Sequence, residues 1–282
     1  MLPRTRLITT VLALASLLLS SNASAKGQLG LEIGAQGHIW EEFVAGTSTR
    51  LLEESGARYT MNLSYDTYTR DSKGLIYGID FLGYIGELDY DGSTQLGVDA
   101  KTSTAYLGSD IRITLGYRLP GTQSKYSWDW LGGLGYNSWG REIGDGVDAL
   151  NNPFSGYTEI YSVFYGHLGA GLFRRGQSWD QYLQFGFKHP IDISEKVEEP
   201  FNVKLEPGAN TSCYFNWNFY KRGKDGMRDY AITRYADSFR FAKSPVVSTS
   251  VDVNGNSIAD DAVFQPESDY SVFGIRLTRY FK

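Results

Sequence analysis

The chain has 282 residues and carries 27 Lys and Arg against 32 Asp and Glu, a net charge of −5 that argues against a nucleic-acid partner. Its single cysteine, Cys213, excludes a disulfide within the chain. Aromatic residues make up 15% of the chain, with 20 Tyr and 6 Trp, which suits a protein that is anchored at two membrane–water interfaces. A soluble, aromatic-rich β-sandwich is the alternative, and the strand pattern has to decide between the two.

The first 25 residues have the three parts of a secretory signal peptide. Arg4 and Arg6 form a positive start, residues 7–19 are free of charge and largely apolar, and residues 23–25 read Ala-Ser-Ala, a small-residue cleavage site. The apolar stretch is too short to span a bilayer as a helix, and no later segment has the roughly 18 consecutive apolar residues that a membrane helix needs. We therefore predict that residues 1–25 are removed on export and that residues 26–282 form one domain.

From residue 28 onwards, apolar and polar residues alternate in long segments. The clearest case is 104–119, where Leu107, Ile111, Ile113 and Leu115 alternate with polar residues such as Arg112. Such segments are longer than the usual five or six residues of a soluble strand and match the tilted strands of a membrane barrel. The pattern predicts ten strands, at 28–40, 57–68, 75–86, 104–119, 125–138, 158–173, 179–189, 209–221, 228–241 and 269–281. In the ninth strand the alternation shifts phase around Arg234, which predicts a β-bulge there.

The predicted connections alternate between short and long. The short ones are 69–74, 120–124, 174–178 and 222–227, and the long ones are 41–56, 87–103, 139–157, 190–208 and 242–268. Outer-membrane barrels have short periplasmic turns and long external loops, whereas a soluble sandwich has no reason to sort its loops by length. An even strand number then places both ends of the chain in the periplasm.

These features predict an all-β fold, a closed antiparallel up-and-down barrel of about ten strands in the outer membrane. A closed barrel pairs every backbone group and leaves no edge, as lipid requires. The last strand ends in alternating aromatic and aliphatic residues up to Phe281 and resembles the C-terminal signal of Gram-negative outer-membrane barrels, although Arg279 interrupts its apolar face and Lys282 follows it. The resemblance implies outer-membrane lipid, lipopolysaccharide and the barrel-assembly machinery as partners. It leaves the oligomeric state open.

Several charged residues fall on the polar face of the strands, where they would line the lumen. They are Arg58, Asp66, Asp80, Asp110, Arg112, Arg118, Glu159, His167, Lys188 and Arg276. In a narrow barrel such groups are expected to fill the lumen with a network of ion pairs and hydrogen bonds, because unpaired buried charges are costly. The alternative is a narrow, wet pore lined by the same groups.

A second set of polar residues lies where two long loops begin: Asp89 and Asp91 in one, His189 and Asp192 in the other. Omptin proteases are barrels of similar size that set a pair of acids opposite a His–Asp pair at the outer rim, and the placement of these four residues resembles theirs. The spacing differs, because His189 and Asp192 are three residues apart whereas the omptin pair is two apart. The resemblance implies hydrolysis by an activated water as an alternative function.

No metal or cofactor site is predicted. The last loop contains Asp252 and Asn256 at spacings similar to a calcium loop, but Asn254-Gly255 within an alternating segment favours a type I′ hairpin. The leading functional hypothesis is a non-enzymatic barrel with surface-exposed loops and a narrow or plugged lumen, in a structural, binding or small-solute role. A rim-located surface hydrolase is the alternative.

Overall fold

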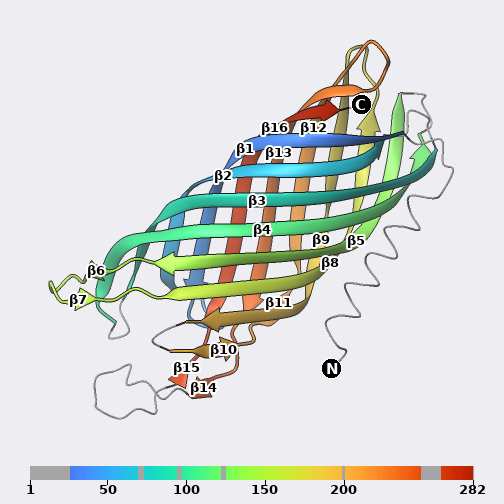
Figure 1. Ribbon diagram of the computed structural model, residues 1–282. Helices are drawn as coiled ribbons and strands as arrows, with labels where there is room; N and C mark the ends of the chain where they lie inside the picture. The colour runs from blue at the N-terminus through green and yellow to red at the C-terminus, as the bar shows by residue number, and fades with distance from the viewer. Residues whose placement is uncertain are drawn as a thin grey trace.

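The computed structural model describes residues 26–68, 73–93, 97–121, 125–198, 201–248 and 262–281, and its regular structure is all β (Figure 1). The predicted signal peptide and the Asn254-Gly255 hairpin lie outside these residues, so both stay predictions. No helix in the described ranges is long and apolar enough to cross a membrane.

Ten long antiparallel strands form a closed barrel, as predicted. They are β1 (Lys26–Phe43), β2 (Arg50–Tyr68), β3 (Gly74–Ser93), β4 (Asp99–Pro120), β5 (Tyr126–Ile143), β8 (Thr158–Arg174), β9 (Trp179–Val197), β12 (Ser212–Arg222), β13 (Arg228–Ala242) and β16 (Glu267–Phe281). Each pairs with its neighbour in the chain, and β16 pairs with β1 to close the ring. The backbone ladder therefore continues around the whole barrel without an edge.

Short strands gather at one end of the barrel (Figure 1). They are β6 (Gly146–Val147), β7 (Pro153–Phe154), β10 (Val203–Leu205), β11 (Gly208–Asn210), β14 (Val247–Ser248) and β15 (Ala262–Val263). A small apolar cluster that includes Val197, Val203 and Leu205 packs among them. This is the end with the long connections, which we call the extracellular end. The other end carries the short turns, the start of β1 and the end of β16, and we call it the periplasmic end.

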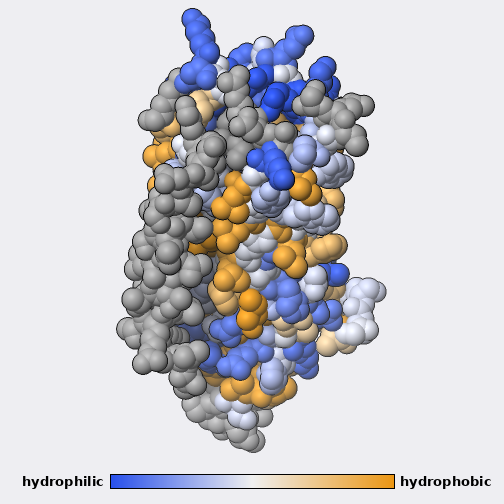
Figure 2. All heavy atoms as spheres, turned by 90° about the vertical axis from the view of Figure 1, so that its right-hand side faces the viewer, coloured by the Kyte–Doolittle hydropathy of each residue, from blue (hydrophilic) through white to orange (hydrophobic). Residues whose placement is uncertain are grey.

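Side chains alternate between the two faces of each strand. On β4, Leu107, Ile111 and Leu115 are exposed on the outside, while Tyr106 and Asp110 are buried in the interior. The same alternation exposes large apolar residues on every wall, and Figure 2 shows apolar side chains across the middle of one face, with hydrophilic ones gathered above them. This outer surface is what a bilayer requires, because the apolar face of each strand points at lipid.

The predicted strand ends are accurate at the periplasmic end, and at the extracellular end they are accurate for β8, β13 and β16 but wrong for several other strands. β2 begins at Arg50, not at residue 57, and β3 continues to Ser93, past its predicted end at residue 86. The segments 41–56 and 87–103, predicted as long loops, are therefore mostly strands. The reason is physical: above the membrane the outer face meets water, so both faces of a strand can be polar and the alternating signal disappears.

The predicted β-bulge at Arg234 is wrong. Side chains of β13 alternate without interruption through this position, and Arg234 lies exposed on the outer face, in register with Trp217 of β12 and Ile275 of β16. The irregularity in this strand pair lies instead at the periplasmic end, where Lys221 pairs with Tyr230 and Arg222 with Arg228. An arginine thus stands on the apolar outer wall without a bulge to turn it inward.

The topology makes a prediction for intact cells. A protease site inserted at 44–49, between β1 and β2, should be cut in whole cells, because this hairpin lies at the extracellular end. The same insertion at 175–178, between β8 and β9, should be cut only after the outer membrane is permeabilised. Immunoblotting for the fragments measures both. Cleavage at 175–178 in intact cells would reverse the orientation.

Candidate functional site: the barrel interior

The extracellular half of the barrel is filled by aromatic side chains. Trp40, Trp139, Tyr161, Phe241 and Tyr270 are at most 4% exposed and contact one another. Trp139 stacks on Tyr161 with ring centroids 4.8 Å apart, and Trp40 lies against Tyr161 at 5.2 Å. We call this group the aromatic plug. It replaces the open centre that a pore would have at this level with close-packed rings.

A cluster of acids surrounds one arginine beside the plug. Arg141 is 1% exposed and makes a bidentate contact with Glu54, with Nε and Nη2 to Oε1 at 3.0 and 2.9 Å. Its Nη1 reaches Glu159 at 2.6 Å and Glu42 at 3.1 Å. Glu195 is also buried at this level. A single guanidinium therefore compensates several carboxylates, which would lose their cation if it were removed.

A second buried arginine lies deeper in the lumen. Arg58 is fully buried and donates from Nη2 to the Tyr270 hydroxyl at 2.7 Å. Its guanidinium lies 4.3 Å from the ring centroid of Tyr84 and 5.5 Å from that of Tyr106. Aromatic faces thus take the place of a carboxylate as the main surroundings of this charge.

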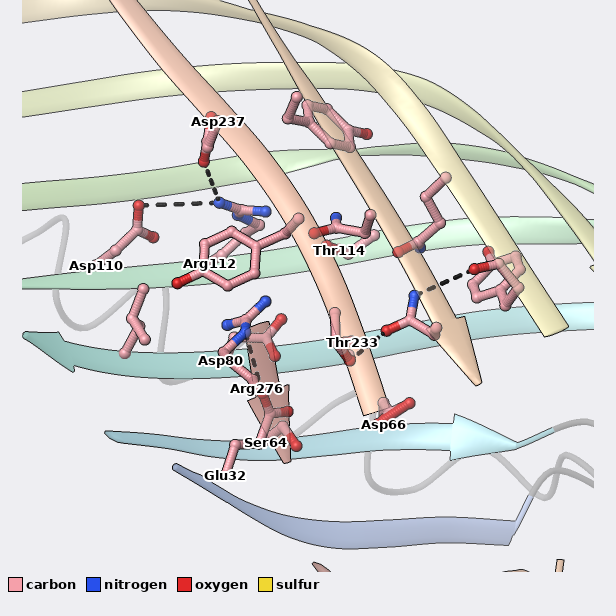
Figure 3. A pocket seen from close by; sticks show the side chains of 18 of the residues that line it. Glu32, Ser64, Asp66, Asp80, Asp110, Arg112, Thr114, Thr233, Asp237 and Arg276 are labelled. Carbon is pink, nitrogen blue, oxygen red and sulfur yellow. Dashed lines mark hydrogen bonds and ion pairs between the residues drawn. The ribbon is translucent and has the colours of Figure 1, made fainter. Parts of the chain in front are cut away.

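Below these layers the charges of the lumen pair across the barrel, as Figure 3 shows for Asp237, Arg112 and Asp110. Arg112 Nη2 lies 3.3 Å from Asp237, and Lys188 also pairs with Asp237. The Tyr165 hydroxyl lies 2.9 Å from both carboxylate oxygens of Asp110. Strands β4, β8, β9 and β13 each contribute a group, so the network ties together opposite walls of the barrel.

The periplasmic half of the lumen contains a polar cavity of about 190 Å³. Asp80, Arg276, Glu32 and Thr114 lie on its wall (Figure 3), and Asn62 donates to Asp80 at 3.5 Å. The volume is sufficient for several water molecules, and the polar lining offers them partners. The cavity ends at the aromatic plug on one side and reaches the periplasmic ring of side chains on the other.

That periplasmic ring combines aromatic rings with two ion pairs. The rings belong to Phe173, Tyr182, Tyr220 and Tyr280. Arg118 and Asp129 form a bidentate pair at 2.8 Å for each contact, and Arg228 contacts Asp66 at 2.9 Å. The guanidinium of Arg118 also covers the Phe173 ring at 4.4 Å.

The sequence predicts ten residues that line the lumen, and in the structure all ten lie in the barrel interior. Arg58, Asp110, Arg118, Glu159, His167 and Lys188 are buried, and Asp66, Asp80, Arg112 and Arg276 are partly buried on the cavity wall. His167 Nε2 lies 3.3 Å from the Ile113 carbonyl, and Arg276 lies 3.4 Å from Glu32. The sequence analysis missed many of their partners, above all Arg141, Glu54, Glu42 and Asp237. The first three lie in segments expected to be loops, and Asp237 was hidden by the phase shift assumed at Arg234.

The four rim residues do not come together, so their predicted arrangement is wrong. Asp89 and Asp91 point outward from β3, where Asp91 pairs with the exposed Lys101 at 2.8 Å. His189 and Asp192 are exposed on β9, and β4, β5 and β8 separate the two strands on one side of the ring. The predicted geometry failed because these strands continue beyond their expected ends, which turns alternate residues away from the lumen. Within the described ranges, no group of three or more His, Cys, Asp or Glu side chains is arranged to hold a metal ion.

Comparisons with known proteins agree with this architecture. No protein family and no curated relative matches the sequence. Among solved structures, the outer membrane protease OmpT from Escherichia coli is similar with a TM-score of 0.54 and 9% identity, covering 93% of this chain and 99% of that one. The transport unit of the autotransporter AIDA-I from Escherichia coli aligns with a TM-score of 0.48 and 11% identity, covering 97% of each chain. At such identities the likeness concerns the fold alone: with OmpT this chain shares the closed antiparallel barrel, and its continuous backbone ladder and apolar outer wall make it a ten-stranded β-barrel of the outer-membrane type.

Proposed function

We propose that this protein is a non-enzymatic outer-membrane barrel whose lumen is closed, and that its extended extracellular end serves as a rigid surface for binding. The aromatic plug carries the proposal. Trp40, Trp139 and Tyr161 are at most 1% exposed, so no water-filled path passes between their rings at this level.

The length of the strands supports the binding role. β4 has 22 residues, whereas a tilted strand needs only about 9–11 to cross a bilayer. The excess lies at the extracellular end, where the acid cluster around Arg141 and the short strands hold it in one shape. Because the rim residues face outward on separated strands, the geometry does not favour the hydrolase alternative.

Single-channel recording in a planar bilayer tests the closed lumen. The refolded wild-type barrel should give no stable conductance steps, because the plug blocks the ion path. The double substitution Trp139→Ala and Tyr161→Ala removes two of the stacked rings and should produce measurable conductance.

The control for folding is migration on gels without boiling, since a closed barrel resists unfolding by detergent and each large-to-small change costs about 3–5 kcal/mol. A second, smaller variant, Phe241→Ala, keeps the test available if the double variant does not fold. Stable, ohmic steps from the wild-type protein would refute the closed lumen.

A further inference from the structure

The outer wall formed by β9, β12, β13 and β16 differs from the rest of the barrel. On β4, outward-facing residues are apolar from Ala105 to Leu119, with Ser109 as the exception. On β13 the outward positions run Tyr230, Ile232, Arg234, Ala236, Ser238 and Arg240. The apolar strip of this wall is therefore shorter, and it contains a charge.

Arg234 lies at the middle of this strip. It is four residues from Tyr230 and four from Ser238. Each residue of a tilted strand rises roughly 2.5 Å along the membrane normal, so Arg234 lies about 10 Å from each of these two levels. Tyr230 marks the periplasmic boundary, because it is in register with Lys221 and Arg279, and the Arg279 guanidinium covers its ring at 4.3 Å. An arginine this deep on the lipid face is costly unless an anion reaches it.

The wall above Arg234 is polar, whereas the outer face of β4 stays apolar over most of its length. Cys213 and Ser271 are exposed, and His189 Nδ1 lies 3.2 Å from the Thr211 hydroxyl. Nearer the extracellular end, Arg240 Nε forms an ion pair with Asp269 Oδ1 at 3.0 Å. The hydroxyls of Ser238 and Ser271 thus line the level that an arginine side chain reaches when it extends from position 234 toward the cell surface, and the His189–Thr211 pair lies beyond them, near the level of Arg240.

Nothing on the described part of the chain neutralises Arg234. Its register neighbours are Trp217 and Ile275, both apolar, and no carboxylate of the described residues pairs with it. A second copy would not supply one either. Two copies that met symmetrically through this wall would bring like charges together, and Asp269 is already paired within each copy.

We propose that this wall binds the phosphate-bearing headgroup of an outer-leaflet glycolipid, the lipopolysaccharide class, with Arg234 as the phosphate ligand. Arginine matches phosphate with two parallel hydrogen bonds, and the polar strip at Ser238 and Ser271 lets the headgroup lie lower against this wall than against the face of β4. The shortened apolar strip and the unpaired charge then have one explanation.

The test uses the full mature barrel in neutral detergent and two probes, bisphosphorylated lipid A and the same lipid with its phosphates removed. Lipid binding is measured by native mass spectrometry on the wild type, Arg234→Leu, Arg234→Lys and the control Arg279→Leu. Wild type should prefer the phosphorylated lipid by about tenfold or more, as a charge-assisted hydrogen bond implies. Arg234→Leu should lose that preference, Arg234→Lys should keep part of it, and Arg279→Leu should keep it all.

Three results would overturn the proposal. The wild type fails to distinguish the two lipids; or Arg234→Leu keeps the full preference; or the wild type forms a dimer that Arg234→Leu disrupts, which assigns the wall to a second copy. Loss of folding is not an expected complication, since leucine is the ordinary residue of a lipid-facing position.

Discussion

Replacing Arg141 with leucine is expected to destabilise the folded barrel by about 3–5 kcal/mol, because it leaves buried carboxylates without their cation. Glu54 is fully buried and Glu159 nearly so, and both contact the arginine directly. The free energy of unfolding, measured by urea titration in lipid vesicles, reports the effect.

The same experiment contains its own controls. Lys101→Ala breaks an exposed ion pair with Asp91 and should change stability by less than about 1 kcal/mol. Adding Glu54→Leu to Arg141→Leu removes one of the stranded charges and should restore part of the loss. If Arg141→Leu is no worse than Lys101→Ala, the cluster does not support the fold.

Replacing Ile113 with arginine is expected to cost about 2–4 kcal/mol in a bilayer, because the side chain would project into lipid near the midplane. Ile113 lies at the centre of the apolar outer strip of β4. The adjacent Thr114 lines the cavity, so Thr114→Arg places the same charge in a polar interior and should be milder.

Unfolding in vesicles measures both variants, and yield of heat-modifiable protein in the outer membrane checks assembly. Equal losses at the two positions would contradict the assignment of lipid and lumen faces. A larger loss at Thr114 would mean that the cavity is too tightly packed to accept the longer side chain.

How well the sequence predicts the strands depends on whether a strand segment lies within the bilayer. Between the two interfaces, lipid outside and polar groups inside enforce alternation, and all ten strands are recognisable there. The short turns also stop the pattern cleanly, so β2 ends at Tyr68 and β9 begins at Trp179, as expected. Beyond the extracellular interface the constraint ends, and the strand pairs there were mistaken for loops.

The sequence predicts which side chains point into the barrel interior, but it does not predict which of them contact one another. Alternation alone places Arg112 and Lys188 in the lumen, yet their common partner Asp237 lies on β13, across the ring from Arg112 on β4 and two strands away from Lys188 on β9. Such contacts depend on the register of every intervening strand, which a single sequence does not encode locally. The aromatic plug was missed for a related reason: the tyrosines and tryptophans were assigned to the membrane interfaces, whereas Trp40, Trp139 and Tyr161 point inward.

Thiol labelling from either side of the membrane tests the central claim, a lumen closed toward the cell surface above a periplasmic cavity, most directly. In a Cys213→Ser background, which removes the exposed native thiol, Thr114→Cys places one thiol on the cavity wall. A small, charged, membrane-impermeant maleimide should fail to label this cysteine in intact cells and should label it once the outer membrane is permeabilised. Rapid labelling in intact cells would show an open path through the plug and contradict the account.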